Sequence, residues 1–421
     1  MMQLKASQLL IVEGVEDDAH MRARAERMRR FIDAAEMRHV DDEHLNAVVE
    51  ELDLNHPSRH GMDMDDDAII IFNRFRFDDS PEQQAARKER YPALLEAPTR
   101  KFSGYGGFDW KVSGTPEWRE RTGCVTQPMY QIHTIVGCPF RCAYCSLGFV
   151  YNIMMNVDEY VARLDGWIAE LAGDQTLFQY DNHTDTVCFE PEYGGTELLV
   201  RYFADKPGRW LELYVGKSDN VDFLLPLEHR GGTIACWSVS GRTQSTAIEL
   251  GAADMDARIQ AARRMQEAGY GVRFRLSPII PVRNWEAENR QLIERIFELT
   301  RPDVITIETL RFLDYDDIVR YLDLSLLDEE WLEVMRSVRG ETPPQGGQIP
   351  DAYRRRMYRF IIDELERVGP ETPYAFCREA LTSWEFFAAD FARHGQHPDN
   401  YVCNCGRVST PDNPIFAHTG A

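Results

Sequence analysis

The sequence predicts an α/β fold in which parallel strands form a partial (β/α)6 barrel, with an N-terminal accessory region and a helical C-terminal extension. From Met129 onward, short β-branched or aromatic runs alternate with segments of helical periodicity. Each parallel crossover needs a helix-length connection, so this alternation indicates a parallel sheet. Six units are visible, fewer than the eight of a closed barrel. The predicted strands are residues 131–136, 186–190, 210–215, 233–238, 272–278 and 303–308.

The length and composition support one barrel-like domain with appendages. The chain has 421 residues, and 43% of them are hydrophobic, which suffices for a substantial core. We expect an accessory region over residues 1–125, the barrel over 126–324 and the helical extension over 325–421.

The N-terminal region mixes charged helices with one apolar run. Glu16–Met37 and Asp41–Leu52 are predicted helices, and Ala68–Phe72 is a predicted buried strand. The acidic turn Asp63–Asp67 is more typical of a solvated loop than of a metal site. Glycines and aromatic residues over Phe102–Trp110 suit either a loop that covers a pocket or an ordinary packed loop.

Helical periodicity fills the connections between the barrel strands. In the first helix the apolar residues fall on one face, and Asn156 with Glu159 can form a capping box. That face comprises Tyr160, Val161, Leu164, Trp167, Ile168 and Leu171. The predicted barrel helices are Val157–Leu171, Thr196–Ala204, Asn220–Pro226, Met255–Ala268 and Trp285–Leu299.

The C-terminal extension carries two amphipathic segments, Tyr353–Val368 and Pro373–Ala392, which we predict as helices. It also contains three cysteines that allow a second metal site or cluster, namely Cys377, Cys403 and Cys405. Because no fourth ligand is visible and the spacing from Cys377 is loose, we expect the tail to cap the barrel rather than to bind a metal.

A cysteine loop follows the first barrel strand, with Cys138, Cys142 and Cys145 spaced three and then two residues apart. Thiolates are the soft ligands that iron–sulfur clusters select, and three of them leave one iron of a [4Fe–4S] cluster open to a substrate. The alternatives are three unrelated buried cysteines or a zinc site without its fourth ligand. The Gly/Pro opening of the loop and the aromatic residue Tyr144 favour the cluster.

This C-x3-C-x2-C loop, with Tyr144 in its aromatic position, resembles that of the radical S-adenosylmethionine (SAM) superfamily. The resemblance implies the partial barrel, a SAM molecule chelated to the open iron, and a 5′-deoxyadenosyl radical formed after electron transfer. It also implies an electron donor such as flavodoxin or ferredoxin. A cluster that solvent can reach needs a reducing compartment, so we expect a cytoplasmic protein.

The second unit of the barrel contains Gly194, Gly195, Thr196 and Glu197. The glycines allow a close backbone approach to a ligand, and the carboxylate can accept hydrogen bonds from an ammonium group. Alone, this pattern also suits a helix start. It resembles the superfamily element that holds the SAM amino group, which implies cofactor binding by these residues.

The third to fifth units add further similarity to one branch of the superfamily, the spore photoproduct lyases. Residues 217–222 resemble that branch, so Lys217 or Ser218 could bind the SAM carboxylate, although a helix cap is the simpler interpretation. Ser238 and Ser240 offer alternating hydroxyls to the ligand on the inner face of the fourth strand. The similarity covers roughly residues 125–320 and also includes Arg273, Arg275, Ser277 and residues 278–281.

One position departs from that branch. In the lyases a cysteine soon after the second strand returns a hydrogen atom to the repaired thymine, and an ungapped match places Tyr193 there. Cys188 is close, but we expect it within the strand as an inert buried thiol. The chain is therefore more similar to lyase-like enzymes of antibiotic biosynthesis, such as the apramycin-pathway dehydratase of an aminoglycoside diol or the blasticidin-pathway decarboxylase of a sugar-linked cytosine.

The charge of the chain bears on its partners. The formal net charge of −22 repels phosphate backbones and argues against a nucleic-acid partner. The chain shows neither the ~20-residue apolar run that a membrane span needs nor a signal-peptide pattern, so no membrane partner is expected. We expect a small, polar, sugar-containing substrate.

The expected reaction is radical 1,2-diol dehydration in antibiotic biosynthesis. Hydrogen abstraction next to a hydroxyl, followed by loss of the hydroxyl proton, gives a ketyl radical that expels the neighbouring hydroxyl as water. This chemistry needs an acid and a base. The candidates near strand ends are Glu190, which we favour, and Tyr214, His183 and Tyr193. The alternatives are a lyase for a DNA photoproduct and an iron–sulfur module without enzymatic activity.

Overall fold

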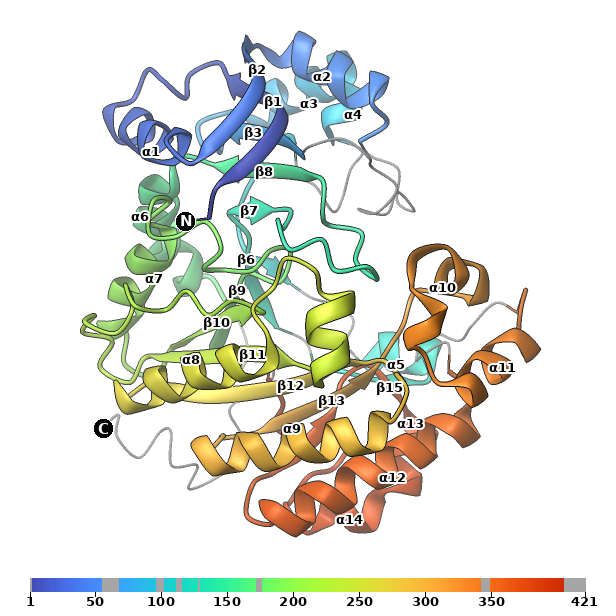
Figure 1. Cartoon of the computed structure of the whole chain (residues 1–421). Coiled ribbons are helices and arrows are strands. Elements are labelled where there is room, and N and C mark those ends of the chain that lie inside the picture. Colours follow the sequence, from blue (N-terminus) through green and yellow to red (C-terminus); the bar gives the residue numbers. More distant parts are fainter. Residues whose placement is uncertain are drawn as a thin grey trace. The chain divides into compact units, whose positions relative to one another are not determined.

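The computed structural model describes residues 2–54, 68–95, 102–110, 116–127, 129–171, 176–341 and 349–404, and its elements are labelled in Figure 1. The chain forms two compact units, each made of several stretches of sequence. The first unit contains Met1–Asp109, Ile132–Ala172 and Asp181–Tyr202, and the second contains Trp110–Gln131, Gly173–Tyr180 and Phe203–Ala421. The predicted acidic turn Asp63–Asp67 and Cys405 lie outside the described residues.

The second unit is built on a curved parallel sheet, as the alternation of strands and helices predicts. Its strand order is β14-β13-β12-β11-β10-β9-β6-β4, and the pairs from β9 to β14 are all parallel. Four predicted strands are confirmed here as β10 to β13. The strands are β4 (Asp109–Trp110), β6 (Tyr130–Ile132), β9 (Leu177–Tyr180), β10 (Trp210–Gly216), β11 (Thr233–Val239), β12 (Gly271–Ile279), β13 (Ile305–Thr309) and β14 (Tyr374–Phe376).

The predicted second strand, residues 186–190, is wrong, because the strand is β9 and lies earlier. Residues 185–193 instead form turns, in which the Glu190 amide donates to the Val187 carbonyl at 3.2 Å and the Tyr193 amide donates to the Phe189 carbonyl at 3.1 Å. Val187, Phe189 and Tyr193 are buried, although this segment is not an extended strand. A short buried run carries no periodicity that distinguishes a strand from a buried turn.

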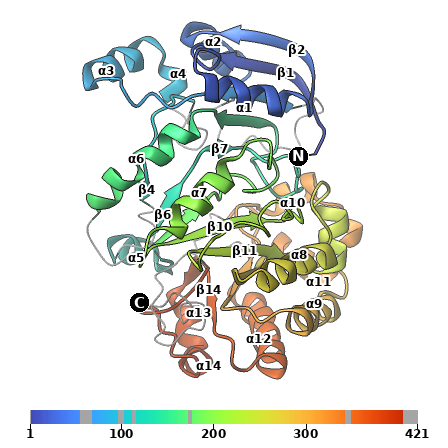
Figure 2. The ribbon, with the colours of Figure 1, turned by 90° about the vertical axis from the view of Figure 1, so that its left-hand side faces the viewer.

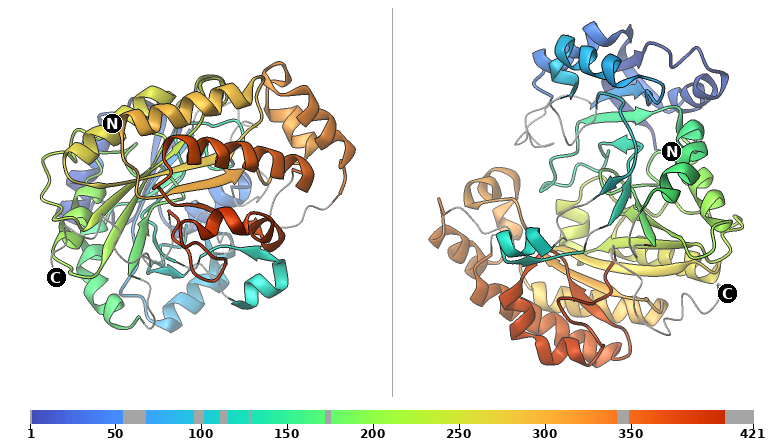
Figure 3. Two further views of the ribbon diagram at one scale, coloured as in Figure 1. Left: turned by 90° about the horizontal axis from the view of Figure 1, so that it is seen from below. Right: turned by 180° about the vertical axis from the view of Figure 1, so that it is seen from behind.

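Long helices pack along one face of the second unit's sheet (Figure 1). They are α8 (Met255–Glu267), α9 (Trp285–Leu299) and α12 (Asp351–Val368), and all three were predicted. The helices α9 and α12 lie side by side in Figures 1 and 3 and contact each other. The predicted helix Asn220–Pro226 is absent, and that segment forms turns. A run of seven residues ending in proline is too short to persist as a helix by propensity alone.

The C-terminal segment is only partly helical. Pro373–Ala392 was predicted as one helix, but it begins with β14, which pairs in parallel with β13 and extends the sheet. The β-branched and aromatic neighbours at this sheet edge override local helix propensity. The remaining elements of the unit are α5 (Pro116–Thr122), β5 (Cys124–Val125), η3 (Gln244–Ile248), α10 (Tyr315–Tyr321), η4 (Leu324–Leu326), α11 (Glu329–Ser337), β15 (Glu379–Ala380), α13 (Leu381–Phe386) and α14 (Ala388–Ala392).

The first unit has its own sheet, with strand order β2-β1-β3-β8-β7. The pairs among β2, β1, β3 and β8 are parallel, and β7 is antiparallel to β8. The predicted strand Ala68–Phe72 is confirmed as β3, which is buried throughout. The strands are β1 (Leu4–Val12), β2 (Ile32–Val40), β3 (Ala68–Asn73), β7 (Ile135–Val136) and β8 (Val150–Met154).

The first unit's helices include α6 and α7, which are seen clearly in Figure 2. The predicted helix Glu16–Met37 is too long, because its second half forms β2 and pairs with β1 along its length. The predicted capping box is also absent, since Asn156 instead binds both backbone groups of Phe75, at 2.7 and 3.0 Å. The helices are α1 (Ala19–Arg29), α2 (Asp42–Glu51), α3 (Pro81–Arg90), α4 (Pro92–Leu95), α6 (Val157–Ala169) and α7 (Gly195–Ala204).

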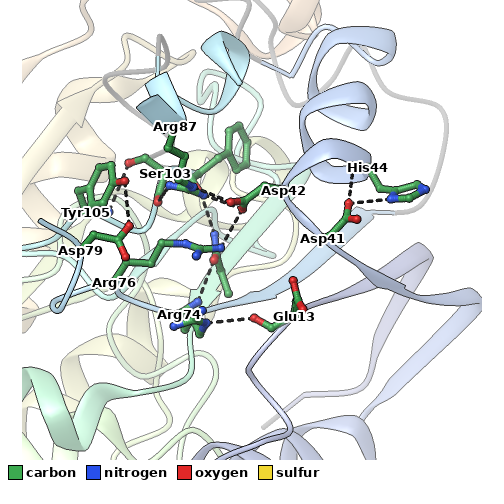
Figure 4. Close-up of polar contacts among 12 residues, drawn as sticks. Glu13, Asp41, Asp42, His44, Arg74, Arg76, Asp79, Arg87, Ser103 and Tyr105 are labelled. Atoms are coloured by element: carbon green, nitrogen blue, oxygen red, sulfur yellow. Dashed lines mark hydrogen bonds and ion pairs between the residues drawn. The ribbon is translucent and has the colours of Figure 1, made fainter. Parts of the chain in front are cut away.

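A partly buried ion-pair cluster links helices α2 and α3 to the segment that follows β3 (Figure 4). The Asp42 carboxylate accepts hydrogen bonds from Arg76 at 2.8 Å and from two nitrogens of Arg87 at 2.7 Å. Burial raises the pKa of Asp42, but the hydrogen bonds and charges of the arginines outweigh it and hold the pKa below its ordinary value.

In the described part of the chain, no helix is long and apolar enough to cross a membrane.

Candidate active site

The cysteine loop begins at Gly137, directly after β7. Gly137 has φ +109°, and a Cβ atom there would collide with the Val150 carbonyl oxygen of β8. Only glycine therefore allows the chain to leave the sheet at this point. The loop closes where the Cys138 amide donates to the Leu147 carbonyl at 3.2 Å.

The three cysteines of the loop differ in exposure and are not in disulfides. Cys142 is buried, whereas Cys138 and Cys145 are partly exposed, and none of them is in a disulfide. The Cys145 amide donates to the Cys142 carbonyl at 2.9 Å, so a turn connects these two cysteines. Among the described residues, only one group of three potential ligands lies within 4.8 Å, and it contains no cysteine. The three thiols therefore do not all lie within 4.8 Å of one another, and their role as cluster ligands stays a prediction.

A small cavity of about 160 Å³ lies against the loop in the first unit. It is lined by Met2, Gln3, Leu4, Lys5, Ala68, Pro139, Arg141, Gly148, Phe149 and Tyr151. Ligand pockets are usually about 300–1,000 Å³, so this cavity is too small for a substrate.

Cys188 lies beside Cys138, in a turn and not in the predicted strand. Its thiol is buried and donates to the Asp185 carbonyl at 3.1 Å. Burial, together with the adjacent Cys138 thiol, raises the pKa of Cys188 well above its ordinary value. Cys188 is therefore a neutral buried thiol, as the sequence suggested, although its position next to a predicted ligand was not foreseen.

Glu190 anchors the segment that begins α7. Its fully buried carboxylate accepts hydrogen bonds from the Gly194 amide at 2.6 Å and from the Thr196 amide at 2.7 Å. Burial raises the pKa of Glu190, and these hydrogen bonds partly offset the rise. The strand-end position on which its catalytic assignment depended is wrong. The contacts favour a positioning role, in which Glu190 fixes the glycine-rich turn.

In the predicted SAM-binding segment, hydrogen bonds to Glu190 fix the backbone, whereas the Glu197 side chain is exposed. Gly194 has φ +75°, and the Thr196 hydroxyl donates to the Thr186 carbonyl at 2.8 Å. Glu197 is 44% exposed and pairs with Arg201 one helical turn away, at 2.8 Å. Its predicted contact with a SAM ammonium group stays a prediction.

Tyr193 is a structural link in the first unit. The side chain is fully buried, and its hydroxyl donates to the Met154 carbonyl at 2.8 Å. Its own carbonyl accepts from the Arg24 guanidinium at 2.6 Å. Burial raises the pKa of Tyr193 far above the neutral range, so proton release from this hydroxyl is disfavoured.

Tyr214 and Ser238 lie on adjacent strands of the second unit, with their hydroxyl oxygens 3.5 Å apart. The Arg275 guanidinium stacks over the Tyr214 ring at 5.1 Å and pairs with Glu308 at 2.6 Å. Ser277 donates to the same carboxylate at 2.7 Å. These β10, β11 and β12 side chains therefore form one polar layer, which includes Tyr214 and Ser238 as predicted candidates.

A second polar group in the same unit surrounds Glu249, which is fully buried. The carboxylate lies 3.7 Å from the Lys217 ammonium nitrogen and 2.6 Å from the Arg258 guanidinium, and it accepts from the Ser240 hydroxyl at 3.0 Å. The neighbouring Ser218 hydroxyl accepts from the Asn220 amide at 3.1 Å within a turn. Lys217 and Ser240 therefore lie next to the same carboxylate, that of Glu249. Their predicted roles toward SAM stay predictions.

Two residues that sequence reasoning missed are His133 and Asp181, which follow β6 and β9. The ring Nδ1 of His133 hydrogen-bonds to the Asp181 carboxylate, and both side chains are buried. The sequence contained a signal for this pair, because each residue comes two positions after a glutamine. In the structure these two glutamines are also in contact, since Gln131 donates to Gln179 at 3.2 Å. Residues two apart share a face of a strand. Misplacing the second strand at 186–190 concealed this match.

The comparisons with known proteins agree with this architecture. Residues 125–314 match the family model described as spore photoproduct lyase. The chain is 29% identical over 174 residues to the spore photoproduct lyase of Geobacillus sp. (strain Y412MC61), covering 40% of this chain and 50% of that protein. It is 28% identical over 191 residues to the Bacillus subtilis (strain 168) lyase, covering 43% and 56%. The match thus spans about half the length of these curated relatives.

A solved structure supports the fold over a larger part of the chain. A spore photoproduct lyase mutant with bound AdoMet and dinucleoside spore photoproduct aligns with TM-score 0.58 and 17% identity. The alignment covers 88% of this chain and 97% of that chain. The chain therefore has the α/β fold with a parallel half-barrel sheet and an added helical extension. The comparisons support the spore photoproduct lyase relationship, while similarity to the antibiotic-biosynthesis enzymes stays a hypothesis.

Proposed function

We propose that this protein is a radical SAM lyase related to spore photoproduct lyase. The observation that carries the proposal is the C-x3-C-x2-C loop, with three unbridged cysteines at the start of a half-barrel. Cys138, Cys142 and Cys145 would hold a [4Fe–4S] cluster, and the turn Gly194–Thr196 would present backbone to SAM. When bound, the cluster and SAM supply a 5′-deoxyadenosyl radical that can remove a carbon-bound hydrogen from the substrate. An electron donor such as flavodoxin or ferredoxin would reduce the cluster.

The first substrate class is a thymine photoproduct, and it is supported by the relatives that match residues 125–314. The second is a small sugar-containing molecule, the class favoured by the sequence. It is supported by the net charge of −22, which opposes a DNA backbone, and by the buried Tyr193 at the place of the expected hydrogen donor.

The cluster is tested with a triple variant, Cys138→Ala, Cys142→Ala and Cys145→Ala, under anaerobic conditions. We expect loss of the cluster's iron and of reductive SAM cleavage, measured as 5′-deoxyadenosine. The matched control replaces three cysteines outside the loop, Cys124, Cys236 and Cys377, and should keep both. Iron content and SAM cleavage equal to the parent in the loop variant would contradict the proposal.

The substrate class is tested separately with the parent protein. Dinucleoside spore photoproduct and neamine, an aminoglycoside with a vicinal diol, are each supplied with SAM and a reductant. Products are measured by mass spectrometry. Conversion of the photoproduct alone would favour the first class, and dehydration of neamine would favour the second.

A further inference from the structure

Three side chains of the first unit form a cluster close to the start of the cysteine loop: His133, Asp181 and His183. Their potential ligand atoms all lie within 4.8 Å of one another. His133 and Asp181 are buried, and His183 is partly exposed. Burial raises the pKa of Asp181, but the two histidines outweigh it and hold that pKa below its ordinary value. Asp181 is therefore ionised at neutral pH.

His183 is fixed at three points. Its amide donates to the Asp181 carboxylate at 3.0 Å, and its carbonyl accepts from the Gly137 amide at 2.9 Å. Its ring stacks on that of His133, with centroids 4.0 Å apart and planes 6° from parallel. Since Gly137 immediately precedes Cys138, these contacts fix the His183 ring relative to the start of the cysteine loop.

The geometry suits a proton better than a metal ion. A metal lies near the plane of each imidazole that binds it, and two parallel rings stacked at 4.0 Å cannot both satisfy this for one ion. The Asp181 oxygens are also occupied by His133, by the His183 amide and by the Thr134 amide at 3.0 Å. A carboxylate that holds one imidazole, which in turn stacks on a second, can instead position the second ring for proton exchange.

We propose that His183 is an acid–base residue that exchanges a proton with a substrate hydroxyl, and that His133 and Asp181 are its positioning residues. The proposal rests on the proposed radical function and selects its substrate class. The O–H bond breaks, its electron pair stays on the substrate oxygen, and the proton moves to a His183 ring nitrogen. His183 then gives this proton to the departing hydroxide, which leaves as water, so no proton is consumed.

The chemistry points to a vicinal diol more than to a photoproduct. Returning a hydrogen atom to a thymine requires no hydroxyl proton, whereas expelling a hydroxyl as water requires both an acid and a base. His183 follows the carboxyl end of β9, and chemistry in barrels of this kind is placed at that end of the strands.

The main experiment compares His183→Ala with His229→Ala. His229 is the control in the second unit, because its ring also stacks on an aromatic ring, that of Tyr270 at 3.7 Å; His229 is buried, whereas His183 is partly exposed. The probes are neamine and a panel of vicinal-diol aminoglycosides and sugar nucleosides. We expect His183→Ala to lower turnover by about 10²–10⁴-fold while 5′-deoxyadenosine formation stays near the parent rate. Added imidazole should restore part of the turnover, an effect that a merely structural role would not produce.

A second measurement does not depend on turnover. In ¹⁵N-histidine-labelled protein without cofactors, the His133 ring should carry its proton on Nδ1, facing Asp181. Asp181→Asn should change the His133 ring nitrogen shifts and leave those of His229 unchanged. Unchanged His133 shifts would overturn the positioning roles.

The outcomes separate this inference from the proposed function. Absence of 5′-deoxyadenosine from the reduced parent would defeat the radical function itself. With SAM cleavage intact, full turnover by His183→Ala, or no product from any diol in the panel, would overturn only the inference. Zn²⁺ or Fe²⁺ bound beyond the cluster and lost in His133→Ala would replace it with a metal site.

Discussion

Replacing Glu190 with glutamine distinguishes a residue that holds the start of α7 from one that moves a proton. The Glu190 carboxylate accepts from two backbone amides, at 2.6 and 2.7 Å, and is fully buried. Glutamine keeps one acceptor oxygen but turns an NH₂ donor toward the other amide. A buried donor left without an acceptor costs about 1–3 kcal/mol. We therefore expect Glu190→Gln to lower the free energy of unfolding by about 1–3 kcal/mol.

The assay is urea unfolding of the protein without cofactors, followed by tryptophan fluorescence, together with calorimetric titration of SAM. SAM binding should weaken in Glu190→Gln, because the turn Gly194–Thr196 loses its anchor. Glu267→Gln is the control for charge, since Glu267 is 59% exposed, pairs with Arg263 on the same helix and has no predicted role toward SAM. Parent-like stability and SAM affinity, combined with slow substrate turnover, would refute the positioning role and restore Glu190 as the acid–base residue.

The pH dependence gives an independent check on Glu190. Burial raises its folded-state pKa above the ordinary 4.5, so the folded protein binds this proton more tightly than the unfolded chain does. The resulting stabilisation is present below pH 4.5 and is lost as pH rises through the folded pKa. Glu190→Gln removes the titrating group, and the slope of stability against pH in this window should decrease. An unchanged slope would mean that Glu190 is not the titrating group there.

Three other predictions concern single sites. Gly137→Ala should abolish iron retention, measured by iron analysis, because the added Cβ collides with the Val150 carbonyl; normal iron content would contradict the loop geometry. Glu197→Ala should change the free energy of unfolding by no more than about 0.5 kcal/mol, because its pair with Arg201 is exposed; a larger loss in urea unfolding would indicate a further contact. Burial lowers the pKa of His229 below 6.5, so stability should fall as pH drops through 6.5, and His229→Gln should reduce this dependence in thermal melts.

The strands that the sequence predicts well are those whose runs are both buried and β-branched or aromatic. The segments 210–215, 233–238 and 272–278 appear as β10, β11 and β12 within one or two residues, and 303–308 overlaps β13. The helices α8 and α9 are likewise near their predicted bounds. In these units, periodicity and local propensity agree with the sheet, so short-range information is sufficient.

The failures occur where distant partners decide the local structure. Ile32–Val40 contains alanine, glutamate and methionine, which favour helices, yet it pairs with β1 as an edge strand. Leu177–Tyr180 is only four residues long, and its role as β9 depends on its neighbour β10. No local pattern encodes these pairings, because propensity is a weak prior that tertiary contacts override.

For the candidate site, the sequence identifies residue types that match a known motif but not those defined by their contacts. The three loop cysteines were selected from their spacing, and Gly194 from its resemblance to a superfamily element. The His133–Asp181 contact joins residues 48 positions apart and appears only once β6 and β9 are correctly placed. For Glu190, a position near an expected strand end suggested catalysis. The structure shows instead that its oxygens accept from two backbone amides, a contact that the sequence did not reveal.

The surroundings of Tyr193 connect the fold to the choice of substrate. Tyr193 donates to Met154 at the end of β8, and its carbonyl holds Arg24, which also pairs with Asp158 of α6 at 2.8 Å. A buried hydroxyl that already donates to a backbone carbonyl is poorly placed to act as a hydrogen donor. The nearby thiol, Cys188, is buried against Cys138, where it adjoins a predicted cluster ligand. A photoproduct substrate would need a hydrogen donor other than the Tyr193 hydroxyl, whereas dehydration of a diol requires the proton exchange that we assign to His183.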